Sequence, residues 1–106
     1  MSDKFPLQVT SATLSSGDNT VIASAAGQAI KVYQVIVAAG ANADAVTLKF
    51  TLAGTAQTAV VTLPVNATIP LQNTGAPWAS CDPGTAFVVN SGTTTTKLTA
   101  YFTKGA

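Results

Sequence analysis

The chain has 106 residues, of which 47% are hydrophobic and only 8% are charged, and its net charge at neutral pH is +1. An ordinary soluble domain has about 25% charged residues, so this sequence is unusually poor in charge. A nearly neutral chain lacks the basic surface that nucleic acids and anionic membranes attract. It contains no histidine, glutamate or arginine, so the commonest general bases of enzymes are missing. The composition therefore indicates no nucleic acid partner, no membrane partner and no enzyme.

Alternation of apolar and polar residues with a period of two predicts short strands along the whole chain. The first two are expected at Leu7–Leu14 and Thr20–Ala25. The next segment, Gln28–Ala39, is more continuously apolar and β-branched, which predicts a central strand covered on both faces.

Ala45–Ala53 is the clearest half-buried strand, because four apolar residues share one face and Thr47, Lys49 and Thr51 share the other. The remaining strands are predicted at Thr58–Leu63, Thr68–Leu71, Thr85–Asn90 and Thr93–Lys104. The run Thr93–Thr96 is expected to begin the last of them, since threonine favours strands.

Turn residues separate these segments, above all the glycines and the tight-turn sequence Asp82-Pro83-Gly84. The longest irregular stretch is Gln72–Pro83, and no window shows the stripe of a helix. About eight short antiparallel strands at this spacing indicate one all-β domain over residues 1–106, either a two-sheet sandwich or a jelly roll. Residues 1–7 are expected to form a flexible N-terminal arm.

The ionisable residues form no recognisable catalytic or metal-binding pattern. Asp18, Asp44 and Asp82 each lie in a turn sequence, where aspartate commonly caps or bends the chain. A zinc site needs more cysteine or histidine than the single Cys81, and a calcium site needs a loop rich in aspartate. Cys81 has no neighbouring base and is expected to be a small buried residue. We expect no catalytic residue, no metal and no cofactor.

Four aromatic residues are candidate core or interface anchors: Phe5, Tyr33, Trp78 and Tyr101. Tryptophan buries a large area and keeps one polar atom, so Trp78 is expected to fill the core or an interface. The alternative is a platform for stacking sugar rings. Carbohydrate readers usually present several exposed rings, however, and Tyr33 and Tyr101 lie on widely separated predicted strands.

The low charge also predicts assembly. Soluble monomers usually carry more surface charge, whereas threonine, serine, asparagine and glutamine supply the polarity here. Such a surface suits a protein that functions in contact with copies of itself. The N-terminus has no basic start followed by an apolar run, so no secretion signal is expected, and synthesis is expected in a cytoplasm.

The stretch Ser16–Val32 places Gly17-Asp18-Asn19-Thr20 and then Gly27 before the apolar segment. The alternating strand from Val46 to Leu52 follows, and after it comes a loop that contains Pro70, Leu71, Gly75, Trp78, Gly84, Ala86 and Phe87. In this order, from Ser16 to Tyr101, the chain resembles small virion proteins of tailed bacteriophages. It departs from them at Ala29 and Lys31, where paired basic residues are common, and at Pro77 and Cys81.

The resemblance implies a jelly-roll β-sandwich of the kind found in capsid decoration (cement) proteins and in head-fibre and tail-fibre modules. It implies a structural virion protein that binds the outer surface of a phage head, with the major capsid protein as partner, as a homotrimer. The expected location is the capsid surface of the virion, after synthesis in the host cytoplasm. The alternative is a fibre, tail or host-surface module that binds carbohydrate.

Overall fold

The computed structural model describes residues 6–73 and 76–105, and the regular elements in these ranges are all β-strands. In chain order they are β1 (Gln8–Thr13), β2 (Gly17–Ile22), β3 (Ala29–Ala38), β4 (Asp44–Leu52), β5 (Thr55–Leu63), β6 (Thr68–Gln72), β7 (Ala79–Cys81), β8 (Phe87–Ser91) and β9 (Lys97–Gly105).

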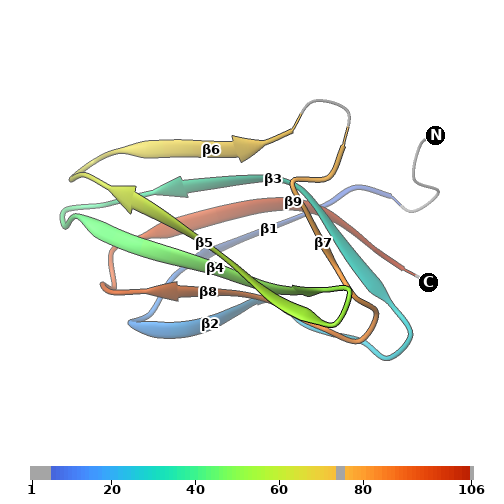
Figure 1. Cartoon of the computed structure of the whole chain (residues 1–106). Helices are drawn as coiled ribbons and strands as arrows, with labels where there is room; N and C mark the ends of the chain where they lie inside the picture. Colours follow the sequence, from blue (N-terminus) through green and yellow to red (C-terminus); the bar gives the residue numbers. More distant parts are fainter. Residues whose placement is uncertain (1–5, 74–75, 106) are drawn as a thin grey trace.

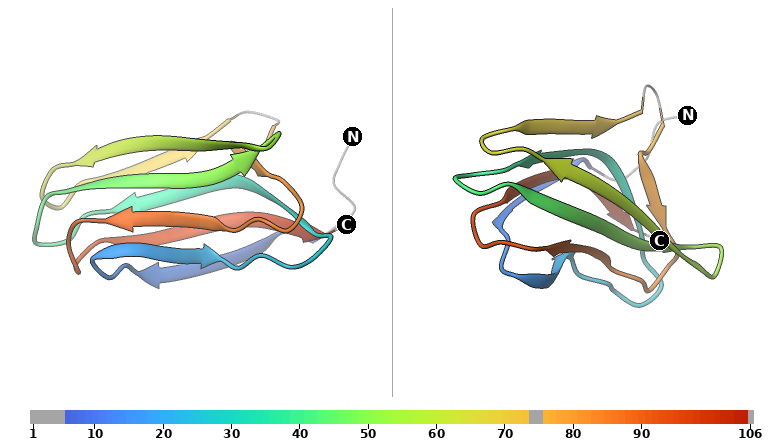
Figure 2. Two further views of the ribbon diagram at one scale, coloured as in Figure 1. Left: turned by 60° about the horizontal axis from the view of Figure 1, so that its bottom comes forward. Right: turned by 60° about the vertical axis from the view of Figure 1, so that its left-hand side comes forward.

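The strands form two antiparallel sheets that pack face to face (Figure 1). One sheet has the order β1-β9-β3-β6, with the short β7 paired to the first part of β3, and the other has the order β2-β8-β4-β5. Figure 2 shows the two layers from two further sides. Almost every pair therefore joins strands that are far apart in the sequence, and the β4–β5 hairpin is the exception.

The core lies between the two layers and consists of the residues that the period-two pattern turns inward. Val46, Leu48 and Val89 of one sheet and Val35 and Val37 of the other are fully buried. Their neighbours along each strand are mostly threonine, lysine, asparagine or small apolar residues that face outward. The pattern therefore fixes which side chains are available on the two outer faces.

The predicted all-β architecture with two antiparallel sheets is confirmed, and the eight predicted strands correspond to β1–β6, β8 and β9. The additional strand, β7, lies in the stretch 72–83 that was predicted to be irregular. The prediction for Thr93–Thr96 is wrong, because β9 begins at Lys97. The Thr96 hydroxyl donates a hydrogen bond to the Asp44 carboxylate, and the Thr93 carbonyl accepts one from the Ser91 hydroxyl, so that this run forms a loop instead.

The prediction that β3 is covered on both faces is also wrong, since Lys31 is exposed and Ile36 and Ala38 are only half-buried. A β-bulge between Val32 and Gln34 explains the continuous apolar run. It shifts the phase of the strand, so that Val32 and Val35 both point into the core although three positions separate them.

The predicted N-terminal arm falls mostly outside the described residues, and Phe5 lies there too. Of the described part, Pro6 and Leu7 are exposed and precede β1.

Candidate functional site

Trp78 comes directly before β7 and packs on the aromatic side of the core. Its ring centroid lies 6.2 Å from that of Phe50, with 58° between the ring planes. Phe50 in turn lies 6.4 Å from the fully buried Phe87. Trp78 is half-buried and packs against the core cluster.

Cys81 closes the same short strand and pairs with Ile30 of β3. The residue is buried. Burial, together with the nearby charge of Asp82, raises the pKa of the Cys81 thiol to about 11. The thiol is therefore protonated at neutral pH and a poor nucleophile.

The two tyrosines lie in the sheet that contains β1, β9 and β3. Tyr101 sits between Val9 and Gln34 on neighbouring strands, and it points outward because Ala100 and Phe102 point into the core. Tyr33 lies at the bulge of β3. Since Trp78 contacts an inward-facing ring of the opposite sheet, Trp78 and Tyr101 do not share one surface.

Asp44 is the most deeply buried carboxylate among the described residues, with 7% exposed. Its Oδ2 accepts hydrogen bonds from the hydroxyls of Ser91 and Thr96, both at 2.6 Å, and its Oδ1 accepts one from the backbone N–H of Gly92 at 2.9 Å. Burial works to raise the pKa of Asp44, but the hydrogen bonds outweigh it and the pKa lies below its usual value. The carboxylate therefore ties the start of β4 to the β8–β9 loop.

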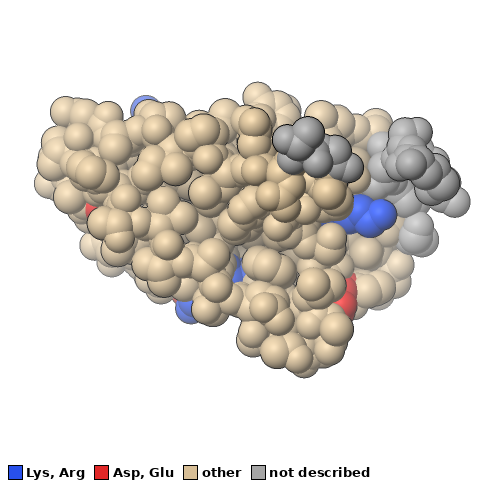
Figure 3. Space-filling view, turned by 45° about the horizontal axis from the view of Figure 1, so that its top comes forward, with Lys and Arg blue, Asp and Glu red and all other residues tan. Residues whose placement is uncertain are grey.

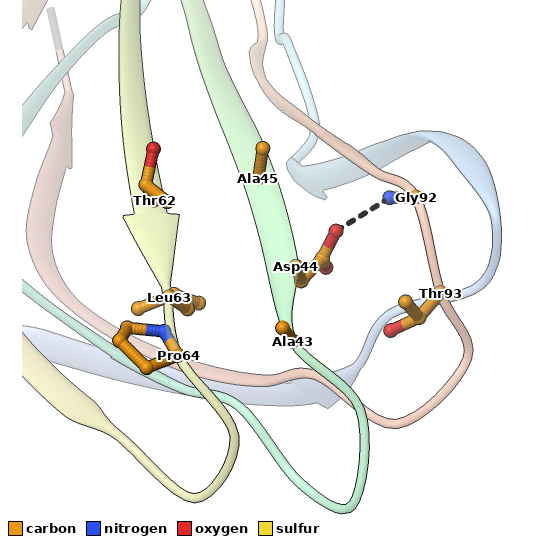
Figure 4. A pocket seen from close by; sticks show the side chains of 8 residues that line it. All are labelled: Ala43, Asp44, Ala45, Thr62, Leu63, Pro64, Gly92 and Thr93. Carbon is orange, nitrogen blue, oxygen red and sulfur yellow. Dashed lines mark hydrogen bonds between the residues drawn. The ribbon is translucent and has the colours of Figure 1, made fainter.

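A shallow hollow of about 400 Å³ lies beside this carboxylate (Figure 4). Its lining is mostly apolar or small, with Leu63 and Pro64 on one side and Gly92 and Thr93 on the other. The Asp44 side chain points toward Gly92, away from Leu63 and Pro64. Because its oxygens already accept three hydrogen bonds from protein atoms, the carboxylate holds the loop and has little capacity for a ligand.

The other two aspartates named from the sequence also join segments of the chain. The Asp82 oxygens accept hydrogen bonds from the backbone N–H groups of Ala53 and Gly54, at 2.9 and 2.8 Å. Asp18 lies within a strand rather than in a turn, and it accepts from Asn90 at 2.8 Å and from Lys49 at 3.0 Å. These two bonds hold the pKa of Asp18 below its usual value.

Asn19 takes the turn role that the sequence suggested for Asp18. Its Oδ1 accepts from the backbone N–H and the hydroxyl of Ser15, and its Nδ2 donates to the carbonyls of Ser15 and Gly17. The turn sequence Ser-Gly-Asp-Asn signals such a bond without showing which of its two polar residues makes it.

The described ranges contain neither a group of three or more potential metal-ligating side chains nor a helix that could cross a membrane. The surface that remains is the outer face of the sheet β2-β8-β4-β5. We call it the threonine face and define it by the outward-facing residues Asp18, Thr20, Ala45, Thr47, Lys49, Thr51, Ala56, Thr58, Val60, Thr62, Val88 and Asn90.

The threonine face is electrically neutral. Its described charged side chains are Asp18 and Lys49, which form a 3.0 Å ion pair. The alternation in β4 predicted that Thr47, Lys49 and Thr51 share a face, but it could not show that β5 and β8 extend it. The side of the molecule turned forward in Figure 3 also carries few charged side chains.

The candidate interaction surface among the described residues is therefore the threonine face, a broad sheet face whose two charged side chains are paired with each other. Comparison with known proteins finds no match of the chain to a family model, a curated protein or a solved structure.

Proposed function

We propose that the protein is a structural virion protein, a decoration protein that binds the outer surface of a phage head as a homo-oligomer and reinforces the shell. The observation that carries the proposal is the neutral threonine face, where Asp18 and Lys49 neutralise each other. Such a face can be covered by another protein without leaving a buried, unpaired charge. The resemblance of residues 16–101 to phage virion proteins supports the same role.

The strand order supports a jelly roll as the type of sandwich. With β7 set aside, the pairs are nested: β1 pairs with β9, β2 with β8, β3 with β6 and β4 with β5. Rolling up one long antiparallel hairpin of eight strands gives this pattern. Jelly rolls of eight strands occur in viral capsid proteins and in lectins, and both of these settings fit the functions considered for this chain.

The proposed attachment uses hydroxyl groups, backbone groups and apolar side chains. A contact that depends on exposed ion pairs weakens with salt, because charges are screened over about 10 Å at 0.1 M and about 3 Å at 1 M. A contact made by uncharged residues such as Thr47, Thr62 and Val88 contains no ion pair, so added salt does not weaken it in this way. Several linked copies add avidity to individually weak sites.

The test mixes the protein with undecorated phage capsids and titrates sodium chloride up to about 1 M. We expect occupancy to be retained throughout and the bound shells to break at a higher temperature than bare ones. Release at moderate salt would show that lysine side chains carry the attachment. Failure to bind capsids, together with binding on a glycan array, would favour the host-surface carbohydrate module instead.

A further inference from the structure

Strand β5 is an open sheet edge without the features that usually protect one. It is the last strand of its sheet and is nine residues long, with no charged residue and no proline. Its Val60 is 67% exposed, more than any other large apolar residue described. Natural proteins protect exposed edges with charges, prolines, bulges or short strands.

The other edge strands carry such protection or are shorter, as the three-residue β7 is. β2 has a bulge after Thr20 and carries Asp18. β6 has five residues and contains Pro70, which cannot donate a backbone hydrogen bond. β1 is uncharged but has six residues against the nine of β5. β5 is therefore the longest unprotected edge of the described chain.

The hairpin geometry fixes which backbone groups of β5 point outward. The β4–β5 turn has two residues, Ala53 and Gly54, so the flanking pair Leu52 and Thr55 exchanges both hydrogen bonds. The register then continues without irregularity to Asp44 and Leu63. Every second residue consequently directs its N–H and C=O away from β4: Ala56, Thr58, Val60 and Thr62, all of them exposed.

We propose that β5 pairs in antiparallel fashion with β5 of a second copy of this chain, so that two four-stranded sheets become one continuous sheet of eight strands. One register pairs all four outward residues with one another. Ala56 lies opposite Thr62 of the second copy, Thr58 lies opposite Val60, and the twofold axis passes beside Ala59. The two copies of β5 can pair closely because neither charges nor bulky side chains meet at the axis.

The contact is between copies of this chain and does not depend on attachment to a shell. It is isologous, so it joins copies in pairs. It therefore gives a dimer in solution in place of the trimer that the resemblance implies. One strand edge covers less than the roughly 1,200–2,000 Å² of a standard stable interface, so the dimer dissociates on dilution.

The first test measures the mass of the free protein by sedimentation over a wide range of concentration. We expect a reversible monomer–dimer equilibrium in the wild type. Val60→Lys places a charge on the edge and abolishes the dimer. Thr47→Lys, which puts the same charge on the same face directly opposite Val60 but inside the sheet, is the matched control and leaves the dimer in place.

The second test is specific for the register. In a Cys81→Ala background, Ala59→Cys brings two thiols together at the axis, where Cα atoms of a non-hydrogen-bonded pair lie about 4.5 Å apart, within disulfide range. We expect this variant to form disulfide-linked dimers under mild oxidation, and we expect Ala56→Cys not to do so. A wild type that is monomeric or trimeric throughout, a dimer that survives Val60→Lys, or equal cross-linking of both cysteine variants would each overturn the proposal.

Discussion

Asp44 combines deep burial of a charged group with several hydrogen bonds to its carboxylate. It accepts hydrogen bonds from Ser91, Gly92 and Thr96 while 93% of the residue is removed from solvent, as its 7% exposure shows. A carboxylate in this position stabilises the fold only while it is ionised and its donors remain in place. The β8–β9 loop contains no strand, and the bonds from Gly92 and Thr96 join it to the start of β4.

We expect Asp44→Ala to lower the free energy of unfolding by about 3 kcal/mol, because buried donors lose a charged acceptor. Urea unfolding measures the change. Asp18→Ala, which removes an exposed ion-paired carboxylate, is the control and has a much smaller effect. An Asp44→Ala protein as stable as the Asp18→Ala protein would contradict the structural role.

The same carboxylate makes stability depend on pH. The pKa of Asp44 is lower in the folded protein than its usual value, so the carboxylate stabilises the fold fully above the unfolded pKa of about 4. This contribution falls as the pH drops below that value and through the folded pKa. The Asp44→Ala protein should therefore lose less stability on acidification than the wild type does.

At the scale of an element, the turn of the β4–β5 hairpin places an alanine, Ala53, in a left-handed backbone conformation that alanine disfavours. The turn has positive φ at both central residues, 53° at Ala53 and 75° at Gly54. A two-residue turn of this kind favours Asn-Gly, and the left-handed region costs an alanine roughly 1 kcal/mol. The Asp82 carboxylate compensates by accepting both backbone N–H groups of the turn.

Ala53→Asn is expected to raise the stability by about 1 kcal/mol, because asparagine tolerates the left-handed region and keeps the N–H that Asp82 accepts. Asn66 already has φ of 60°, so Asn66→Ala is the matched reversal and should destabilise the protein. Both changes in stability are measured as shifts of the urea concentration at the unfolding midpoint, provided that the dependence of the unfolding free energy on urea concentration stays the same. An Ala53→Asn protein that is less stable than the wild type would show that the turn is not strained.

A strand could be predicted from the sequence where one of its faces is buried and the other is exposed, because its residues then alternate between apolar and polar, as in β4. A strand could not be predicted where its formation depends on pairing with residues distant in the chain. β7 is three residues between Pro77 and Pro83, and only its contact with Ile30, Lys31 and Val32 makes it a strand. Thr93–Thr96 has the composition of a strand, but it forms a loop in which the Thr96 hydroxyl donates to the carboxylate of the distant Asp44.

Part of the threonine face could likewise be predicted, because one of its strands shows a clear alternating pattern. Thr47, Lys49 and Thr51 follow from alternation along β4. The neutralisation of Lys49 by Asp18 depends on the order β2-β8-β4, which no local pattern contains. The open edge of β5 is likewise a property of topology, because its composition alone does not separate an edge strand from a central one.

At the scale of the whole molecule, the nested pairing makes most contacts long-range. Gln8 pairs with Phe102, nearly the full length of the chain away, whereas the β4–β5 hairpin closes across a two-residue turn. Loop closure costs more entropy as the separation grows. The local hairpin is therefore expected to form before the pairs that enclose it, and the chain is expected to fold slowly, in milliseconds to seconds.

Stopped-flow fluorescence of Trp78, the single tryptophan, tests this order of events. Ala53→Asn acts in the hairpin, so it should speed folding and leave the unfolding rate nearly unchanged. Ala100→Gly acts in β9, between Thr10 and Val35. It weakens a fully buried strand position by about 1 kcal/mol and should mainly speed unfolding. If Ala100→Gly slows folding while Ala53→Asn changes only unfolding, the outer pairs form first and the nested order of assembly is wrong.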